Sequence, residues 1–421
     1  METREIDLIE EAYIALPKGF KANGVAAGLK SNAANINPDV EKSLVLDVCL
    51  VESDVPANVA GVYTSNLVKG HSLTRSIKKI DMGGKMRAMI VNSKNANAAV
   101  GKVGEEDAEE VAKAVAAKLG CTSDEVLTAS TGVIGSRLPV DKITKIIPEL
   151  VDSLSADEES AHNSEFAMMT TDTVPKEVAA TITMGDGKEV TIAAQAKGSG
   201  MIHPNLATMI SVFTTDANIS SALIDKALRK AVKYTFNRVS VDGDTSVCDS
   251  VIVMANGASG ASEITEGSED YELFEQALTK LADDIARMLA ADGEGASKFI
   301  EIEVTGAKDE YDAKLIVTSV ARSPLVKTAM FGEDANIGRV LTAVGYSGAK
   351  FDPNKIDILV GGMLFFHDGI CVDFDEDEAA KILAQHDIFI QIKLSEGDAY
   401  DRMFTCDFTY DYVKINGSYR T

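Results

Sequence analysis

Hydrophobic and polar positions follow two different periods along the chain. Residues 105–119 and 270–291 place apolar side chains at helical spacing and predict amphipathic helices. Short apolar runs rich in β-branched residues, such as 86–92 and 209–215, predict buried strands. Strands and helices alternate on both sides of the middle of the chain, which predicts an α/β or α+β fold with mixed sheets.

The same patterns predict the remaining elements, including a hairpin that pairs 178–183 with 190–194 across Gly185–Gly187. Pro148 predicts a kink or break in the helix expected at 140–154. Further helices are expected at 140–154, 161–169, 220–234, 340–344 and 378–385. Further strands are expected at 43–52, 299–304, 315–320, 356–360, 388–394 and 408–415.

Length and composition limit the class of protein. A chain of 421 residues is too long for one ordinary core, so two or three structural units are expected. The 41 basic and 65 acidic residues give a net charge of −24, which argues against nucleic acid or an anionic membrane as a partner. The five scattered cysteines favour a reducing cytoplasm over a disulfide framework, and the charged N-terminus lacks an apolar signal core.

The most unusual stretch lies at mid-chain, in residues 197–216. Its first half is rich in glycine and its second half predicts a strand, with Ala207-Thr208 at the junction. A threonine hydroxyl needs a base to act as a nucleophile, and a threonine at a new N-terminus can use its own α-amine. By itself the pattern fits a structural threonine at the start of a strand better than a catalytic one.

The sequence lacks the motifs of several common enzyme classes. The chain has no G-x-x-x-x-G-K-[ST] phosphate loop, no H-E-x-x-H and no G-x-S-x-G. His203 in the central stretch could act as a base, but a structural role is the better interpretation for a lone histidine beside proline. We therefore expect no metal site.

Nine segments in order resemble the ornithine acetyltransferase (glutamate N-acetyltransferase) family of arginine biosynthesis. The stretch 197–210 is similar to that family's self-cleavage signature, and the likeness extends over essentially the whole chain. The other segments are 17–28, 92–97, 130–135, 169–176, 242–246, 293–299, 331–339 and 415–421.

The resemblance implies a self-processing enzyme. The precursor would cut itself between Ala207 and Thr208 into an α chain (1–207) and a β chain (208–421), intertwined in one catalytic unit. Thr208 would then take the acetyl group of N2-acetylornithine and pass it to glutamate by a ping-pong route. Thr131 and Gly132 would form the oxyanion hole, a role that suits their glycine-containing turn.

The resemblance also implies the substrate contacts and the assembly. A lysine suits the carboxylate of a zwitterionic amino acid, a glutamate suits an ammonium group, and amides and hydroxyls supply neutral hydrogen bonds. The implied substrate-binding residues are Thr171, Lys197, Thr208, Glu294, Asn416 and Thr421. The implied architecture is a layered sandwich with a smaller C-terminal α/β unit, assembled as α2β2, with no cofactor and with acetyl-CoA as a candidate second acetyl donor.

Two other functions stay open at this point. An N-terminal-nucleophile aminopeptidase or amidase would share the processing logic and the architecture, and would differ in passing the acyl group to water. A binding protein that keeps the fold without processing is the third candidate. A denaturing gel separates the third from the other two, because only a processed chain gives two bands of about half size.

Overall fold

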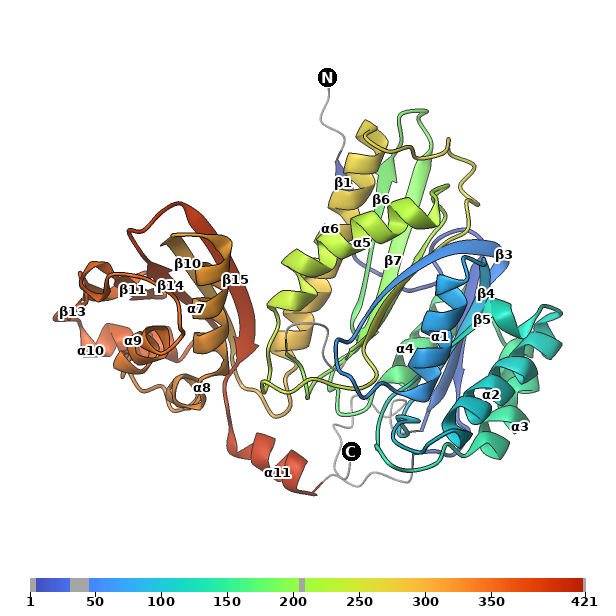
Figure 1. Cartoon of the computed structure of the whole chain (residues 1–421), viewed down its shortest axis with the longest axis horizontal. Coiled ribbons are helices and arrows are strands. Elements are labelled where there is room, and N and C mark those ends of the chain that lie inside the picture. Colours follow the sequence, from blue (N-terminus) through green and yellow to red (C-terminus); the bar gives the residue numbers. More distant parts are fainter. Residues whose placement is uncertain (1–4, 31–44, 204–208, 419–421) are drawn as a thin grey trace.

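The computed structural model describes residues 5–30, 45–203 and 209–418, arranged as a large unit and a smaller C-terminal unit (Figure 1). The large unit is built on nine strands in the order β1-β6-β7-β8-β9-β3-β4-β5, with β2 paired to β3. Only the pairs β8–β9 and β4–β5 are parallel. These strands are β1 (Ile6–Ile9), β2 (Phe20–Val25), β3 (Val48–Tyr63), β4 (Met86–Asn92), β5 (Val126–Ser130), β6 (Glu177–Thr183), β7 (Glu189–Lys197), β8 (Ile210–Thr215) and β9 (Ser250–Ala255).

The smaller unit contains a sheet in the order β13-β12-β11-β14-β10-β15. Its central pair, β10 and β14, is parallel, while β15 pairs with β10 in the antiparallel direction. The sheet is therefore mixed, as predicted for the fold class. Its strands are β10 (Phe299–Ala307), β11 (Asp357–Val360), β12 (Met363–His367), β13 (Ile370–Cys371), β14 (Asp387–Lys393) and β15 (Ala399–Cys406).

Helices cover both sheets. The helices α1 to α6 belong to the large unit, and α7 to α10 pack with the smaller sheet. In chain order they are α1 (His71–Asp81), α2 (Val103–Leu119), α3 (Val140–Asp152), α4 (Glu158–Met168), α5 (Ser221–Tyr234), α6 (Glu269–Ala291), α7 (Glu310–Arg322), α8 (Pro324–Phe331), α9 (Gly338–Gly345), α10 (Glu376–Leu383) and α11 (Tyr410–Ser418).

The large unit is layered because β3 takes part in two halves of its sheet. The first part of β3 pairs with β2 and β4, the register shifts between Glu52 and Ala57, and the last part pairs with β9. Neighbouring residues of β8 enter different cores: Val212 packs between the two halves, and Phe213 packs under α5 and α6. A further core joins the β2–β5 half to α2 and α3. The order helix, sheet, sheet, helix can be followed across Figure 1, and it confirms the predicted layered architecture.

Two predicted strands are wrong. Residues 315–320 lie in α7, because Ala313, Ile316, Val317 and Val320 are buried at helical spacing and the Asp309 carboxylate caps the first turn. The β-branched residues that suggested a strand occupy the buried stripe of this helix. Residues 408–415 lie largely in α11, while the strand that completes the sheet is the preceding β15.

Other predicted elements are confirmed or shifted at their ends. The β6–β7 hairpin forms with the predicted pairing, and the helices at 105–119, 220–234 and 270–291 are present as α2, α5 and α6. Pro148 lies inside α3, which continues past it to Asp152. Helix α1 was missed. None of the helices in the described ranges is both long enough and apolar enough to span a bilayer.

The close contact between β2 and α4 makes Gly24 sensitive to substitution. A Cβ at Gly24 would lie 2.0 Å from the carbonyl oxygen of Asn163 and 2.9 Å from the Ala167 Cβ. We expect Gly24→Ala to lower the free energy of unfolding by about 1–3 kcal/mol through overpacking. Gly84→Ala is the matched control, because a Cβ there meets only the Met86 Cε at 4.0 Å. Urea titration should show a change within about 0.5 kcal/mol for the control, and equal effects for both variants would contradict this packing.

Candidate active site

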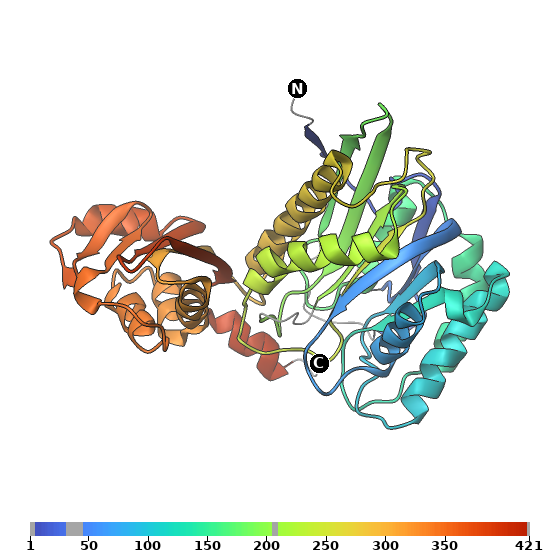
Figure 2. The same cartoon turned by 45° about the horizontal axis from the view of Figure 1, so that its top comes forward.

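A pocket forms where the ends of several elements of the large unit meet helix α11. Thr131 follows β5 directly, Lys197 is the last residue of β7, and Glu294 lies just after α6. Asn416 reaches the same pocket from α11, which crosses from the smaller unit to the large one (Figures 1 and 2). The described lining residues are Ala96, Thr131, Gly132, Ile134, Thr170, Thr171, Lys197, Gly200, Met201, Asp242, Asp244, Ser246, Val247, Cys248, Glu294, Tyr412 and Asn416.

The turn after β5 brings Thr131 and Gly132 to the pocket wall. The Thr131 N–H donates to the Asn92 carbonyl oxygen at 2.9 Å, so this N–H is occupied. Gly132 has φ +128°, and a Cβ there would lie 2.2 Å from the Lys94 carbonyl carbon, so glycine is required. The Thr131 hydroxyl and the Gly132 N–H have no hydrogen-bond partner among the described residues. Both can donate a hydrogen bond to a developing oxyanion.

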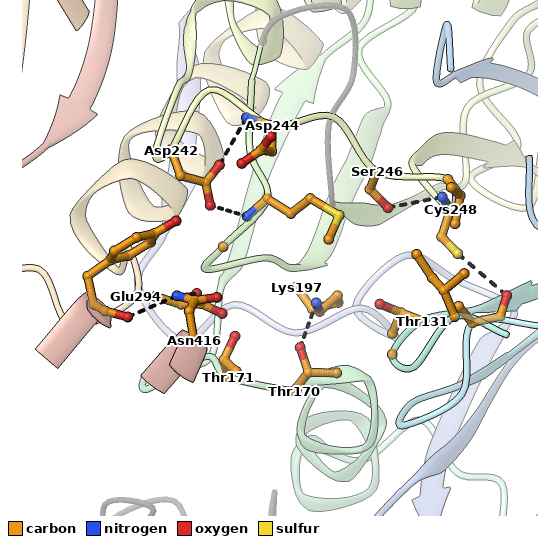
Figure 3. A pocket seen from close by; sticks show the side chains of 17 residues that line it. Thr131, Thr170, Thr171, Lys197, Asp242, Asp244, Ser246, Cys248, Glu294 and Asn416 are labelled. Atoms are coloured by element: carbon orange, nitrogen blue, oxygen red, sulfur yellow. Dashed lines mark hydrogen bonds between the residues drawn. The ribbon is translucent and has the colours of Figure 1, made fainter. Parts of the chain in front are cut away.

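Lys197 supplies a buried positive charge at the middle of the pocket (Figure 3). Its side chain is 2% exposed, and its ammonium donates to the Thr170 hydroxyl at 2.8 Å. The Asp172 carboxylate lies 3.9 Å away. An ammonium group has three protons to donate, so Lys197 can also bind an anionic group in the pocket.

A fully buried ion network lies behind Lys197. The Lys176 ammonium contacts the Asp172 carboxylate at 2.9 Å and the Asp292 carboxylate at 2.6 Å. Asp172 also accepts hydrogen bonds from the backbone N–H groups of Thr170 at 2.9 Å and Gly198 at 2.5 Å. Burial acts to raise the pKa of Asp172, but the ammonium groups of Lys176 and Lys197 outweigh it and hold that pKa below its usual range. The network thus fixes both the 170–172 segment and the chain that follows Lys197.

At the other side of Lys197, the Glu294 carboxylate accepts a hydrogen bond from the Asn416 side-chain amide at 2.7 Å. Gly200 leaves room for this carboxylate, since a Cβ at position 200 would lie 2.3–2.5 Å from its atoms. Figure 3 shows the Glu294–Asn416 pair and Thr131 on opposite sides of Lys197. Across the pocket, the carboxylate of Glu294, the cation of Lys197 and the two neutral donors of Thr131 and Gly132 therefore follow one another.

Asp242 fixes the backbone of residues 201 and 202 beside the pocket. Its carboxylate accepts from the backbone N–H groups of Met201 at 2.6 Å and Ile202 at 3.1 Å. Burial raises the pKa of Asp242 to about 6. Met201 has φ +58°, so these bonds hold the chain in a conformation that a side-chain-bearing residue rarely adopts.

The structure brings together every predicted site residue that it describes. Six residues from five segments of the sequence line this one pocket: Thr131, Gly132, Thr171, Lys197, Glu294 and Asn416. Ala207, Thr208 and Thr421 lie outside the described residues, and the roles assigned to all nine stay predictions. His203 does not line this pocket; its Nδ1 lies 3.0 Å from the Ser240 hydroxyl, in accord with the structural role preferred above.

The prediction missed the groups that hold the site residues in place. Asp172, Lys176 and Asp292 are not themselves in the lining, so no argument from substrate chemistry selects them. Asp172 and Lys176 stand four residues apart in the segment 169–176, and this spacing of opposite charges was the available signal. Asp242 likewise lies in the quoted segment 242–246.

Comparison with known proteins decides the family. The model described as "ArgJ family" matches residues 22–421. The chain belongs to the ArgJ family. Among its relatives, the arginine biosynthesis bifunctional protein ArgJ of Caldanaerobacter subterraneus subsp. tengcongensis is 44% identical over 98% of this chain and 100% of the relative. That of Geobacillus kaustophilus is 42% identical over 100% of this chain and 99% of the relative.

Solved structures of ArgJ proteins match parts of the chain. The arginine biosynthesis bifunctional protein ArgJ of Bacillus halodurans is 40% identical, covering 49% of this chain and 97% of its own, with a TM-score of 0.47. Ornithine acetyltransferase of Mycobacterium tuberculosis, solved in complex with ornithine, is 36% identical, covering 48% of this chain and 100% of its own, with a TM-score of 0.42. The ArgJ family comprises acetyltransferases of arginine biosynthesis, so the predicted family and enzyme class are confirmed.

The buried network predicts a large loss of stability on removal of its central cation. Lys176→Met would leave Asp172 and Asp292 without the cation that contacts both, with only Lys197 as a countercharge 3.9 Å from Asp172, which should cost about 3–5 kcal/mol of unfolding free energy. Lys226→Met is the matched control, because the Lys226–Glu266 pair at 2.7 Å is solvent-exposed and should contribute less than about 1 kcal/mol. Denaturant unfolding of both variants checks this. A loss at Lys176 as small as at Lys226 would show that the network does not stabilise the fold.

Proposed function

We propose that this protein transfers the acetyl group of N2-acetylornithine to glutamate, giving ornithine and N-acetylglutamate. The observation that carries the proposal is the convergence of Thr131, Gly132, Thr171, Lys197, Glu294 and Asn416 on one pocket. These residues come from segments spread over 286 positions, from 131 to 416, and were implied by the family resemblance. Membership of the ArgJ family supports the same reaction class.

The order of groups in the pocket suits N2-acetylornithine. Lys197 would bind the α-carboxylate, which lies next to the acetylated nitrogen. The Thr131 hydroxyl and the Gly132 N–H would then stabilise negative charge on the acetyl oxygen. Glu294, on the other side of Lys197 (Figure 3), would bind the side-chain ammonium. Asn416 and Thr171 would supply neutral hydrogen bonds, and Thr421 is proposed to join them.

Transfer would proceed in two steps on Thr208. The precursor would first cleave itself between Ala207 and Thr208, giving the chains 1–207 and 208–421. The Thr208 hydroxyl oxygen would attack the acetyl carbon while its proton passes to the freed α-amine, the C–N bond would break, and ornithine would leave with that proton. The glutamate amine would then attack the resulting ester and restore the hydroxyl, completing a ping-pong cycle.

Two further proposals concern the oligomeric state of the protein and its cellular compartment. We propose an α2β2 assembly of the two chains, on the family resemblance alone. A reducing cytoplasm is proposed because the five cysteines are all free thiols. Acetyl-CoA stays a candidate second acetyl donor.

Self-cleavage is tested most directly at Thr208. Thr208→Ala removes the hydroxyl that is the proposed nucleophile, so we expect a single full-length band on a denaturing gel and no acetyl transfer. Thr208→Ser retains a hydroxyl and is expected to be cut. The far-ultraviolet circular dichroism of the two variants should match. Two bands or residual transfer in Thr208→Ala would refute the assignment.

The proposed role of Glu294 predicts an effect that depends on the substrate. Glu294→Gln keeps the shape of the side chain but removes the charge that would meet the ornithine ammonium, so KM for N2-acetylornithine should rise about 10–100-fold. The KM for glutamate, which has no side-chain ammonium, should change much less. Glu272→Gln on the exposed side of α6 is the control and should leave both constants unchanged. Equal changes in both KM values would argue against an ammonium-binding role.

A further inference from the structure

A second cavity lies beside helix α7 and shares none of its described lining residues with the first pocket. Its volume is about 590 Å³, within the range of roughly 300–1,000 Å³ that is typical of ligand sites. The described lining residues are His203, Tyr311, Lys314, Leu315, Thr318, Ser319, Arg322, Ser323, Pro324, Tyr346 and Ser347. Nothing in the proposed acetyl transfer uses this cavity.

The charge of the cavity is opposite to that of the whole chain. The protein carries a net charge of −24, yet the described lining contains Lys314, Arg322 and His203 and neither aspartate nor glutamate. No ion pair is formed by Lys314 or Arg322 within the described ranges. Burial, together with these two cations, lowers the pKa of His203 to about 4. An anion bound here would meet two cations, although Lys314 also lines a neighbouring cavity with the carboxylates of Glu310, Asp398 and Asp401.

Four of the lining residues form one stripe along α7. Tyr311, Lys314, Thr318 and Arg322 are spaced by three or four residues, so they share a helix face. The Thr318 hydroxyl oxygen is buried and has no hydrogen-bond partner among the described residues, which is uncommon for a buried polar group. Tyr311 is 70% exposed and, from the end of α9, Tyr346 is 61% exposed. The two aromatic rings can stack on a planar ligand group.

The cavity also touches the wall of the first pocket. His203 lies 3.0 Å from the Ser240 hydroxyl, and Arg322 packs against Gly243. Both contacts are on the segment 240–244, whose Asp242 and Asp244 line the first pocket. A ligand in the second cavity would therefore contact side chains that pack on the other side of the segment that borders the first pocket.

We propose that this second cavity binds a phosphorylated nucleotide. Lys314 and Arg322 would bind its phosphate oxygens by charge-assisted hydrogen bonds, and Tyr311 and Tyr346 would contact the base. Such a nucleotide has two sources: a free effector molecule, or the nucleotide end of an acyl-coenzyme A donor. Both present the same phosphate and adenine chemistry to the cavity.

The experiment measures binding by isothermal titration calorimetry at low ionic strength, with ADP, coenzyme A and inorganic phosphate as probes. The full-length protein should bind ADP or coenzyme A more tightly than inorganic phosphate. The double variant Lys314→Glu/Arg322→Glu should bind at least about tenfold more weakly, because two charge-assisted contacts are lost. Lys381→Glu/Lys393→Glu, an equal charge change at exposed positions of α10 and β14, should bind as the unaltered protein does.

The probes separate the two sources. The ligand is the acyl donor if coenzyme A binds and the double variant loses glutamate acetylation from acetyl-CoA while keeping acetylation from N2-acetylornithine. The ligand is a free effector if ADP binds and coenzyme A does not. If the double variant fails to fold, Lys314→Glu alone provides the test, because Lys314 is exposed. No binding of either nucleotide, phosphate binding as tight as nucleotide binding, or unchanged binding in the Lys314 variants would overturn the proposal. Retained transfer from N2-acetylornithine to glutamate in those variants keeps this outcome separate from the proposed function.

Discussion

The buried Lys176 ammonium between the Asp172 and Asp292 carboxylates is the contact on which the site depends. It joins the loop after α4 to the end of α6, two segments 116 residues apart in the chain. Burial penalises the charged form of both carboxylates, and that cation contacts both of them. The chain must therefore bring these segments together in order to fold, and in doing so it brings together the residues next to them.

The consequences for the pocket follow from chain connectivity. Asp172 binds the backbone N–H of Gly198 at 2.5 Å, which fixes the turn that follows Lys197. The Ser199 hydroxyl donates to the Asp292 carbonyl oxygen at 2.7 Å, and the Glu294 N–H donates to the Ser199 carbonyl oxygen at 3.0 Å. The cation of Lys197 and the carboxylate of Glu294 are thus held by one connected set of bonds. A transferase that must hold an amino acid at both ends needs this kind of fixed separation.

How much the sequence could predict differed between the strands, the helices and the site. Short apolar runs predict buried strands such as β4 and β8, and a long stripe of apolar residues at helical spacing predicts α6. The strand predicted at 315–320 was wrong because β-branched residues fill the buried stripe of α7, where tertiary packing outweighs local preference. The site residues were implied by the family resemblance, and the described ones lie together in one pocket. The supporting network was not predicted, because contacts such as Lys176–Asp292 depend on the tertiary fold.

The central claim is that Thr208 carries the acetyl group after the chain has cut itself. Intact-mass spectrometry after incubation with N2-acetylornithine, with no glutamate present, measures this directly. We expect two chains, 1–207 and 208–421, with one acetyl group on the second, located on Thr208 by fragmentation and removed when glutamate is added. An active uncut chain, or an acetyl group on any other residue that glutamate removes, would contradict it.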